Sequence, residues 1–173
     1  MPHQTEPPQS ITGALRHTAV GIRALRTALV LQGQGLVSRY IRQRDEASTG
    51  GFIPLNLRVA VRENDRSVQI EWVLIHVRKK IFRGTTLLAK PKDTRNFDLA
   101  TLKRSIAKTE WLWPIAIEAE LEARPLRESL ARLTEMERGI RAIANRLCPD
   151  DLASIFTFDD NALTQPDSDE DLP

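Results

Sequence analysis

Apolar residues recur every seven positions in the first third of the chain, which places them on one face of a long helix. The positions are Leu15, Ile22, Leu29 and Leu36, with Leu25 and Tyr40 beside them. Ser10 is a suitable N-cap for this helix, and the small residues at 47–51 end it. Gly33 and Gly35 weaken it and predict a kink or a division near its C-terminal third.

The period changes from seven to two in the middle of the chain. Apolar and polar residues alternate through residues 55–62 and again through 68–75, which predicts two half-buried strands. Residues 63–66 form the turn between them, and a third strand is expected at residues 80–88, after a short basic turn. Three strands joined by short turns predict an antiparallel meander.

The last third of the chain returns to helical spacing. Asp98 is a suitable cap for a short helix at residues 99–106, and a long helix is expected at 110–147. The apolar stripe of the long helix comprises Ala119, Leu126, Leu130, Leu133, Met136, Ile140, Ile143 and Leu147. Pro125 lies inside this pattern and predicts a kink or a division. The fold class is therefore α+β in the order α-β-β-β-α-α, with helical stripes that pack on the sheet, on each other or across a symmetric homodimer.

Length and composition fit one globular domain between two polar ends. With 173 residues, 41% hydrophobic and 28% charged, the chain can bury one core. We expect a disordered arm at residues 1–9, a single α+β domain at 10–148 and an acidic, mostly disordered tail at 149–173. No apolar run approaches the roughly 18 residues of a membrane span, and the N-terminus lacks the pattern of a signal peptide. These features predict a cytoplasmic protein with no membrane partner.

Charge is sorted along the chain. Residues 1–148 carry 25 basic and 15 acidic groups, a formal charge of +10, whereas residues 149–173 carry eight acidic groups and no basic one. A basic body with an acidic tail favours a surface that binds a polyanion and a segment that competes for it or recruits a partner. The alternative is a solvated surface with a tail that promotes solubility.

Residues suited to catalysis are poorly placed. The three histidines lie far apart in the chain and lack a second metal ligand at helical spacing. Cys148 has no histidine visibly placed to activate it, and a single cysteine cannot form an intrachain disulfide. Glu118, Glu120 and Glu122 alternate on the expected helix, so they cannot all meet one substrate. We therefore predict no catalytic residue, no metal ligand, no cofactor and no enzyme.

Basic residues between the strands and the last helix form the best candidate site. Lys and Arg satisfy phosphates from many geometries, so a cluster of loop cations supplies affinity without a motif. The candidate DNA contacts are Arg58, Arg62, Arg78, Lys79, Lys80, Arg83, Lys90, Lys92, Arg95, Lys103 and Arg104. Arg58 and Arg62 share one strand face and, with Gln69, suit a ribbon that enters a major groove. An aromatic content of 5% favours double-stranded DNA over a single strand.

Several segments follow one another in a characteristic order: LRVAVR at 57–62, SVQIEW at 67–72, the basic hairpin, EWLW at 110–113 and the region 118–127. This order resembles the MobI family of conjugative-transfer auxiliary proteins. In that family a strand with an IEW-like end precedes a basic hairpin, and a helix with a WE-like start closes the domain. Here Glu110 precedes Trp111, which departs from that order. The resemblance covers about residues 55–147 and implies a bacterial mobile genetic element, a relaxosome and its origin of transfer, with no catalytic residue to carry over.

Together these patterns predict a cytoplasmic protein that binds duplex DNA and helps a relaxase or another transfer protein at its site. The alternative is a non-catalytic adaptor that binds a protein through its amphipathic helices. An enzyme acting on an anionic substrate is the third interpretation. A homodimer is expected if the two helical stripes do not satisfy each other within one chain.

Overall fold

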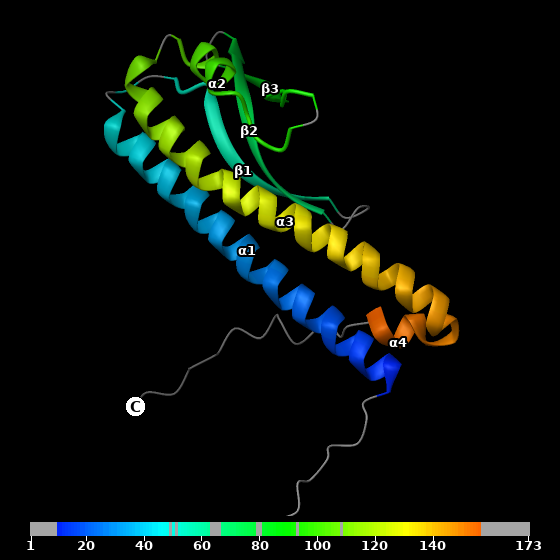
Figure 1. Ribbon diagram of the computed structural model, residues 1–173. Coiled ribbons are helices and arrows are strands. Elements are labelled where there is room, and N and C mark those ends of the chain that lie inside the picture. Colours follow the sequence, from blue (N-terminus) through cyan, green and yellow to red (C-terminus); the bar gives the residue numbers. More distant parts are fainter. Residues whose placement is uncertain are drawn as a thin grey trace, which may run out of the picture. The chain divides into compact units, whose positions relative to one another are not determined.

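A computed structural model describes residues 10–48, 50, 52–62, 67–78, 81–92, 94–107 and 109–156, without the side chains of Arg62 and Arg78. The expected arm at 1–9, the turn at 63–66, Lys79, Lys80 and the tail from residue 157 lie outside these residues. The elements are α1 (Ile11–Ala47), β1 (Leu55–Arg62), β2 (Ser67–Arg78), β3 (Ile81–Leu87), α2 (Leu99–Ser105), η1 (Glu110–Leu112), α3 (Trp113–Leu147), η2 (Pro149–Asp151) and α4 (Leu152–Phe156) (Figure 1). This order confirms the α+β class and the helix–meander–helix sequence.

Packing divides the chain into two compact units. Unit 1 comprises Met1–Gly21 and Glu137–Pro173, and unit 2 comprises Ile22–Met136. The two long helices contribute residues to both units, whereas the sheet and α2 belong to unit 2 alone. Each unit has its own hydrophobic cluster.

Helix α1 runs through both glycines without interruption, so the predicted division there is wrong. Gly33 is buried, and a Cβ placed on it would lie 3.3 Å from the side chains of Val59 and Ile70. These side chains belong to β1 and β2, so the missing Cβ lets the helix approach the sheet closely. Gly35 has no such neighbour within 4 Å.

The three strands form one antiparallel sheet in the order β1-β2-β3. In the first ladder Leu57 faces Trp72, and Arg58 faces Glu71. The alternating pattern is confirmed on the helix-facing side of this ladder, where Leu55, Leu57, Ile70 and Trp72 are buried. In the second ladder the pairing is regular from the pair Val73–Leu87 to the pair His76–Gly84. A bulge follows between His76 and Val77.

The core of unit 2 joins both long helices to one face of the sheet. Leu36 and Tyr40 come from α1, and Leu130 and three alanines come from α3. The rings of Tyr40 and Trp72 meet edge to face at 5.1 Å, and the Tyr40 hydroxyl donates to the Leu55 carbonyl at 3.1 Å. Burial raises the pKa of Tyr40 well above its ordinary value, although the charge of Arg44 opposes this shift. The two helical stripes therefore share a core within one chain.

The buried stripe is narrower than the sequence pattern indicated. Ile22 and Leu133 are buried as expected, and Leu29 and Leu126 are partly buried against the core. The predicted stripe members Leu25, Met136, Ile143 and Leu147 are exposed instead. Only part of each predicted stripe is therefore buried.

Helix α3 also runs unbroken, from Trp113 to Leu147, so the predicted division at Pro125 is wrong. The proline lies on an exposed part of the helix surface. The loss of one backbone donor there is compatible with a continuous helix when the freed carbonyl faces solvent.

Unit 1 has a small cluster built from Ala19, Ala144 and Ile155, with Leu152 and Phe156 of α4 beside it. Leu152, Ile155 and Phe156 thus pack the start of the acidic segment into this unit. The Thr12 hydroxyl donates to the Asp151 carboxylate at 3.0 Å, and the Arg141 guanidinium lies 4.2 Å from the centre of the Phe156 ring. Phe158 lies outside the described residues.

Candidate nucleic-acid interface

The segment between β3 and α2 ends at a well-defined helix cap. The Asp98 carboxylate accepts hydrogen bonds from the backbone N–H groups of Ala100 and Thr101, at 3.3 and 2.9 Å, and from the Thr101 hydroxyl at 2.8 Å. These bonds hold the pKa of Asp98 below its usual range, and the bond from the Thr101 hydroxyl contributes most. The cap predicted at this residue is confirmed, and it fixes where α2 begins.

Phe97 anchors the same segment to α3 through its backbone and its ring. Its N–H donates to Glu120 Oε1 at 3.1 Å, and its carbonyl accepts from Arg124 at 3.3 Å. The guanidinium of Arg127 lies 4.8 Å from the ring centre, and the Lys90 ammonium lies 5.2 Å from it. The main chain on both sides of this buried ring is therefore held in place.

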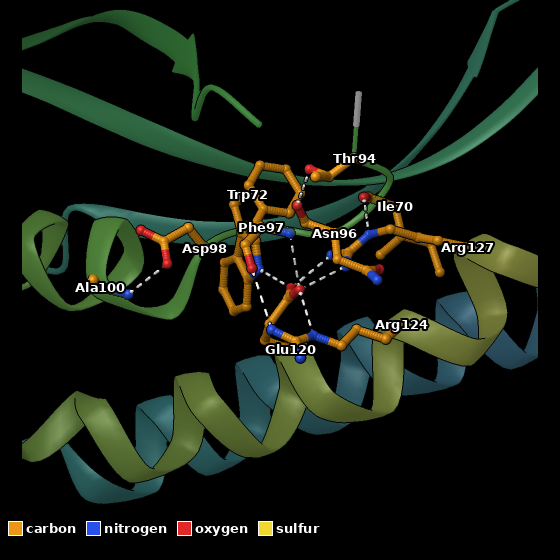
Figure 2. Close-up of polar contacts among 10 residues, drawn as sticks. All are labelled: Ile70, Trp72, Thr94, Asn96, Phe97, Asp98, Ala100, Glu120, Arg124 and Arg127. Atoms are coloured by element: carbon orange, nitrogen blue, oxygen red, sulfur yellow. Dashed lines mark hydrogen bonds and ion pairs between the residues drawn. The ribbon is translucent and has the colours of Figure 1, made fainter. Parts of the chain in front are cut away.

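Glu120 lies at the centre of this anchorage (Figure 2). Its side chain is fully buried and accepts two hydrogen bonds from Arg127, at 2.9 and 2.8 Å, and one from Trp72 Nε1 at 2.8 Å. Arg127 also donates through Nε to the Ile70 carbonyl at 2.8 Å. A bidentate pair with these additional bonds satisfies a charge that burial would otherwise penalise heavily. The network joins α3, β2 and the loop before α2.

This arrangement assigns Glu120 a structural role. Both of its oxygens are occupied by donors from the protein, so the carboxylate has no free position from which to take a substrate proton. The sequence pattern treated Glu118, Glu120 and Glu122 as equivalent, but the first and last are exposed. The signal that separates them is the arginine pair Arg124 and Arg127, four and seven residues after Glu120 on the same helix face.

The loop and α2 concentrate positive charge. Residues 90–104 carry five basic and two acidic groups. The exposed cations in this segment are Lys92, Arg95, Lys103 and Arg104. Arg95 forms an ion pair with Glu135 at 2.6 Å, and the Lys103 ammonium lies 5.7 Å from the centre of the Trp113 ring. Arg104 donates to the Thr101 hydroxyl at 2.9 Å.

The cations of the sheet are arranged differently. Arg58 donates to the Glu71 carboxylate at 3.1 and 3.3 Å, and this carboxylate is almost completely buried, so much of the arginine charge is balanced within the fold. Arg83 is exposed on β3. The remaining four candidates have no described side chain, namely Arg62, Arg78, Lys79 and Lys80. The register places Arg58, Arg62 and Gln69 on one face of the β1–β2 ladder.

An open groove of about 660 Å³ lies between α1 and α3 in unit 2. It is lined by Gln32, Gly35, Leu36, Ser38, Arg39, Arg42, Glu122, Pro125 and Leu126. Arg39 and Glu122 form an ion pair across it. Its lining combines apolar residues with this ion pair and with Arg42, a mixture that suits a peptide side chain.

The described residues contain neither a metal-binding cluster nor a membrane-spanning helix. In that part of the chain, no three His, Cys, Asp or Glu side chains lie close enough to hold a metal ion. Likewise, no helix there has the length and the apolar character needed to cross a membrane.

Comparison with known protein families identifies a match to most of the domain. The family described as MobI protein matches residues 29–141. This range contains most of α1, the whole sheet, α2 and most of α3, together with all the candidate DNA contacts. No curated protein and no solved structure matches the chain.

Proposed function

Because the chain belongs to the MobI family, we propose that it binds duplex DNA at the origin of transfer of a mobile genetic element and acts there with a relaxase. Family membership supports the coarser part of this function, a role related to conjugative transfer. The finer part, DNA binding in the bacterial cytoplasm beside a relaxase, rests on the charge and the geometry described above.

The observation that carries the proposal is the anchored basic segment at residues 90–104. Lys92, Lys103 and Arg104 present charge at the surface, while Phe97 and Asp98 hold the backbone between them. A rigid backbone lowers the entropy that binding must remove, so such cations bind phosphates better than cations on a free chain. Lys90 and Arg95 add two further cations to the same segment, of which Arg95 is paired with Glu135.

Binding is tested by fluorescence anisotropy with an origin-of-transfer duplex and a random duplex over a range of salt concentrations. If about five phosphates are contacted, the logarithm of the affinity should fall against the logarithm of the salt concentration with a slope of roughly −4 to −5. A higher affinity for the origin duplex than for the random duplex at equal salt would show that the protein prefers the origin sequence. Absence of binding to either duplex at low salt would contradict the proposal.

The acidic tail gives this function a built-in competitor. Residues 159–173 carry six acidic groups, and a tethered polyanion stays near the basic body at a high effective concentration. Deleting these residues should raise the affinity for random duplex, and more so at low salt, where the competition is least screened. A matched variant keeps the length but replaces the six acidic residues with Asn or Gln, and it should behave like the deletion. Unchanged affinity in both variants would instead favour recruitment of a basic partner such as the relaxase.

The groove between α1 and α3 favours a second function, that of an adaptor without DNA contact. In that case a transfer protein would occupy the groove. Leu126→Arg would then weaken binding of the transfer protein, and it would not change the affinity for DNA. Co-purification with the relaxase, together with no DNA binding at low salt, would select this alternative.

A further inference from the structure

The strand β3 presents a free edge. Among the described strands it pairs with β2 alone, and it forms one border of the sheet (Figure 1). Nearly all of its residues are exposed, including the large apolar side chains of Ile81, Phe82 and Leu87. An apolar edge strand with unpaired backbone groups is a template for another strand.

One hydrogen bond determines which backbone groups face outward. The Leu88 N–H donates to the Trp72 carbonyl at 2.9 Å, so these residues form a hydrogen-bonded pair. Bonded and non-bonded pairs alternate along an antiparallel ladder, so Thr86 and Gly84 also bond to β2. The N–H and carbonyl groups of Thr85 and Leu87 therefore point to the free edge.

The half of β3 from Gly84 to Leu87 has little protection against pairing with another strand. The bulge lies near the start of β3, opposite His76 and Val77, and leaves the ladder from Gly84 to Leu87 regular. Bulges and charged residues are the usual devices that block an edge. Arg83 is the only charged residue of β3, and it lies outside the regular half.

We propose that this edge pairs with the same edge of a second copy, antiparallel and centred on Thr86, to form a continuous six-stranded sheet. In this register Thr85 faces the partner's Leu87, and Leu87 faces the partner's Thr85. All four outward N–H and carbonyl groups of each copy are then used, which gives four hydrogen bonds across the two-fold axis.

Side chains in this register are self-complementary. Thr86 faces the partner's Thr86, a favourable cross-strand pair, and the two Leu87 side chains lie diagonally within contact reach. Arg83 of one copy does not face Arg83 of the other, so no like charges oppose each other. A partner strand of different sequence would lack this symmetric match, which is why a second copy is the assigned occupant. The short interface implies a weak dimer with a Kd on the order of micromolar. This inference is independent of DNA binding.

The dimer is tested by sedimentation equilibrium of the full chain from about 1 to 200 µM, a range that brackets the weak affinity expected of a small interface. Thr85→Pro removes an outward N–H but no hydrogen bond to β2, and it should weaken the dimer at least tenfold. Thr85→Val keeps the donor and should have little effect. A monomer throughout the range, or equal weakening by both variants, would overturn the proposal.

Cross-linking gives a second measurement that does not depend on the proline variant folding. In a Cys148→Ser background, Thr86→Cys places the two thiols opposite each other at the axis and should form a disulfide-linked dimer under mild oxidation. The control is Arg83→Cys on the same strand. Residue 83 of one copy does not face residue 83 of the other, so this variant should cross-link at least tenfold more slowly. Equal rates for the two variants would contradict the register and the interface.

Discussion

Arg127 and Lys92 belong to the same unit but to two different regions of charge. Around Glu120, the arginine side chain is almost completely buried, and its guanidinium is bound by a carboxylate and the carbonyl of Ile70. In the loop before α2, the lysine side chain is exposed. The first region neutralises its charge inside the fold, whereas the second presents its charge to solvent.

The basic residues of this unit therefore fall into two groups, one bound inside the fold and one exposed at its surface. The buried pair holds Phe97 and hence the loop, and the loop presents cations at the surface. A count of Lys and Arg along the sequence combines the two groups. Substitutions that separate stability from DNA binding can therefore test whether the distinction is correct.

The largest effect is expected from Arg127→Met, which keeps most of the side-chain volume but leaves the buried Glu120 carboxylate with only the longer ion pair to Arg124, at 3.4 Å. Breaking a buried ion pair on one side costs about 3–5 kcal/mol of unfolding free energy. The control is Arg132→Met, which removes an exposed i,i+4 ion pair with Glu128 and should change stability by less than about 1 kcal/mol. Urea unfolding followed by circular dichroism measures both, and equal losses would contradict the assigned role of the network.

Two neighbouring apolar residues of α3 give the next largest difference. Leu133 is buried and Met136 is exposed, although the sequence pattern placed both in the core. Leu133→Ala should cost about 2–5 kcal/mol, because it removes buried apolar volume and leaves a cavity. Met136→Ala should cost less than about 1 kcal/mol, as expected for a surface position. A reversed order in thermal unfolding would mean that the face of α3 turned to the core is misassigned.

A smaller difference is expected between the two glycines of α1. Gly35→Ala should raise stability by up to about 1 kcal/mol, because alanine favours a helix and the new methyl group meets no neighbour within 4 Å. Gly33→Ala has the same gain in propensity, but its methyl group approaches Val59 and Ile70 at 3.3 Å. Its unfolding free energy should therefore be lower than that of Gly35→Ala. Equal stability would show that the helix–sheet contact can relax.

The smallest expected effect is the contribution of Asp98 to stability, which depends on pH. Its pKa is lowered in the folded protein, so its contribution to stability is full above its ordinary pKa and is lost as pH falls through the folded pKa. Asp98→Ala should therefore be less stable than the wild type at neutral pH, and the difference should shrink below about pH 4. A difference that stays constant from pH 7 to pH 2 would rule out the ionised cap as its cause.

Local patterns predicted the elements that depend on near neighbours in sequence. Alternation located β1 and β2, and Asp98 is predictable as a cap because the N–H donors to its carboxylate lie two and three residues away. The role of Glu120 could not be predicted in the same way, since its donors include Trp72 and Phe97, far away in sequence. Continuity of the helices was also missed, because glycine and proline propensities ignore the tertiary packing that stabilises them.

The most direct test of the account compares two triple substitutions in their effect on DNA binding. Lys92, Lys103 and Arg104 lie in the anchored basic segment, whereas Arg16, Arg138 and Arg146 are also exposed but belong to unit 1. Replacing either set with alanine removes the same charge. The first triple should flatten the salt slope of binding to duplex DNA by about 2–3 units, because up to three phosphate contacts are lost, while the second should leave it nearly unchanged. Equal slopes for the two variants would contradict the assignment of the anchored segment as the phosphate-binding surface.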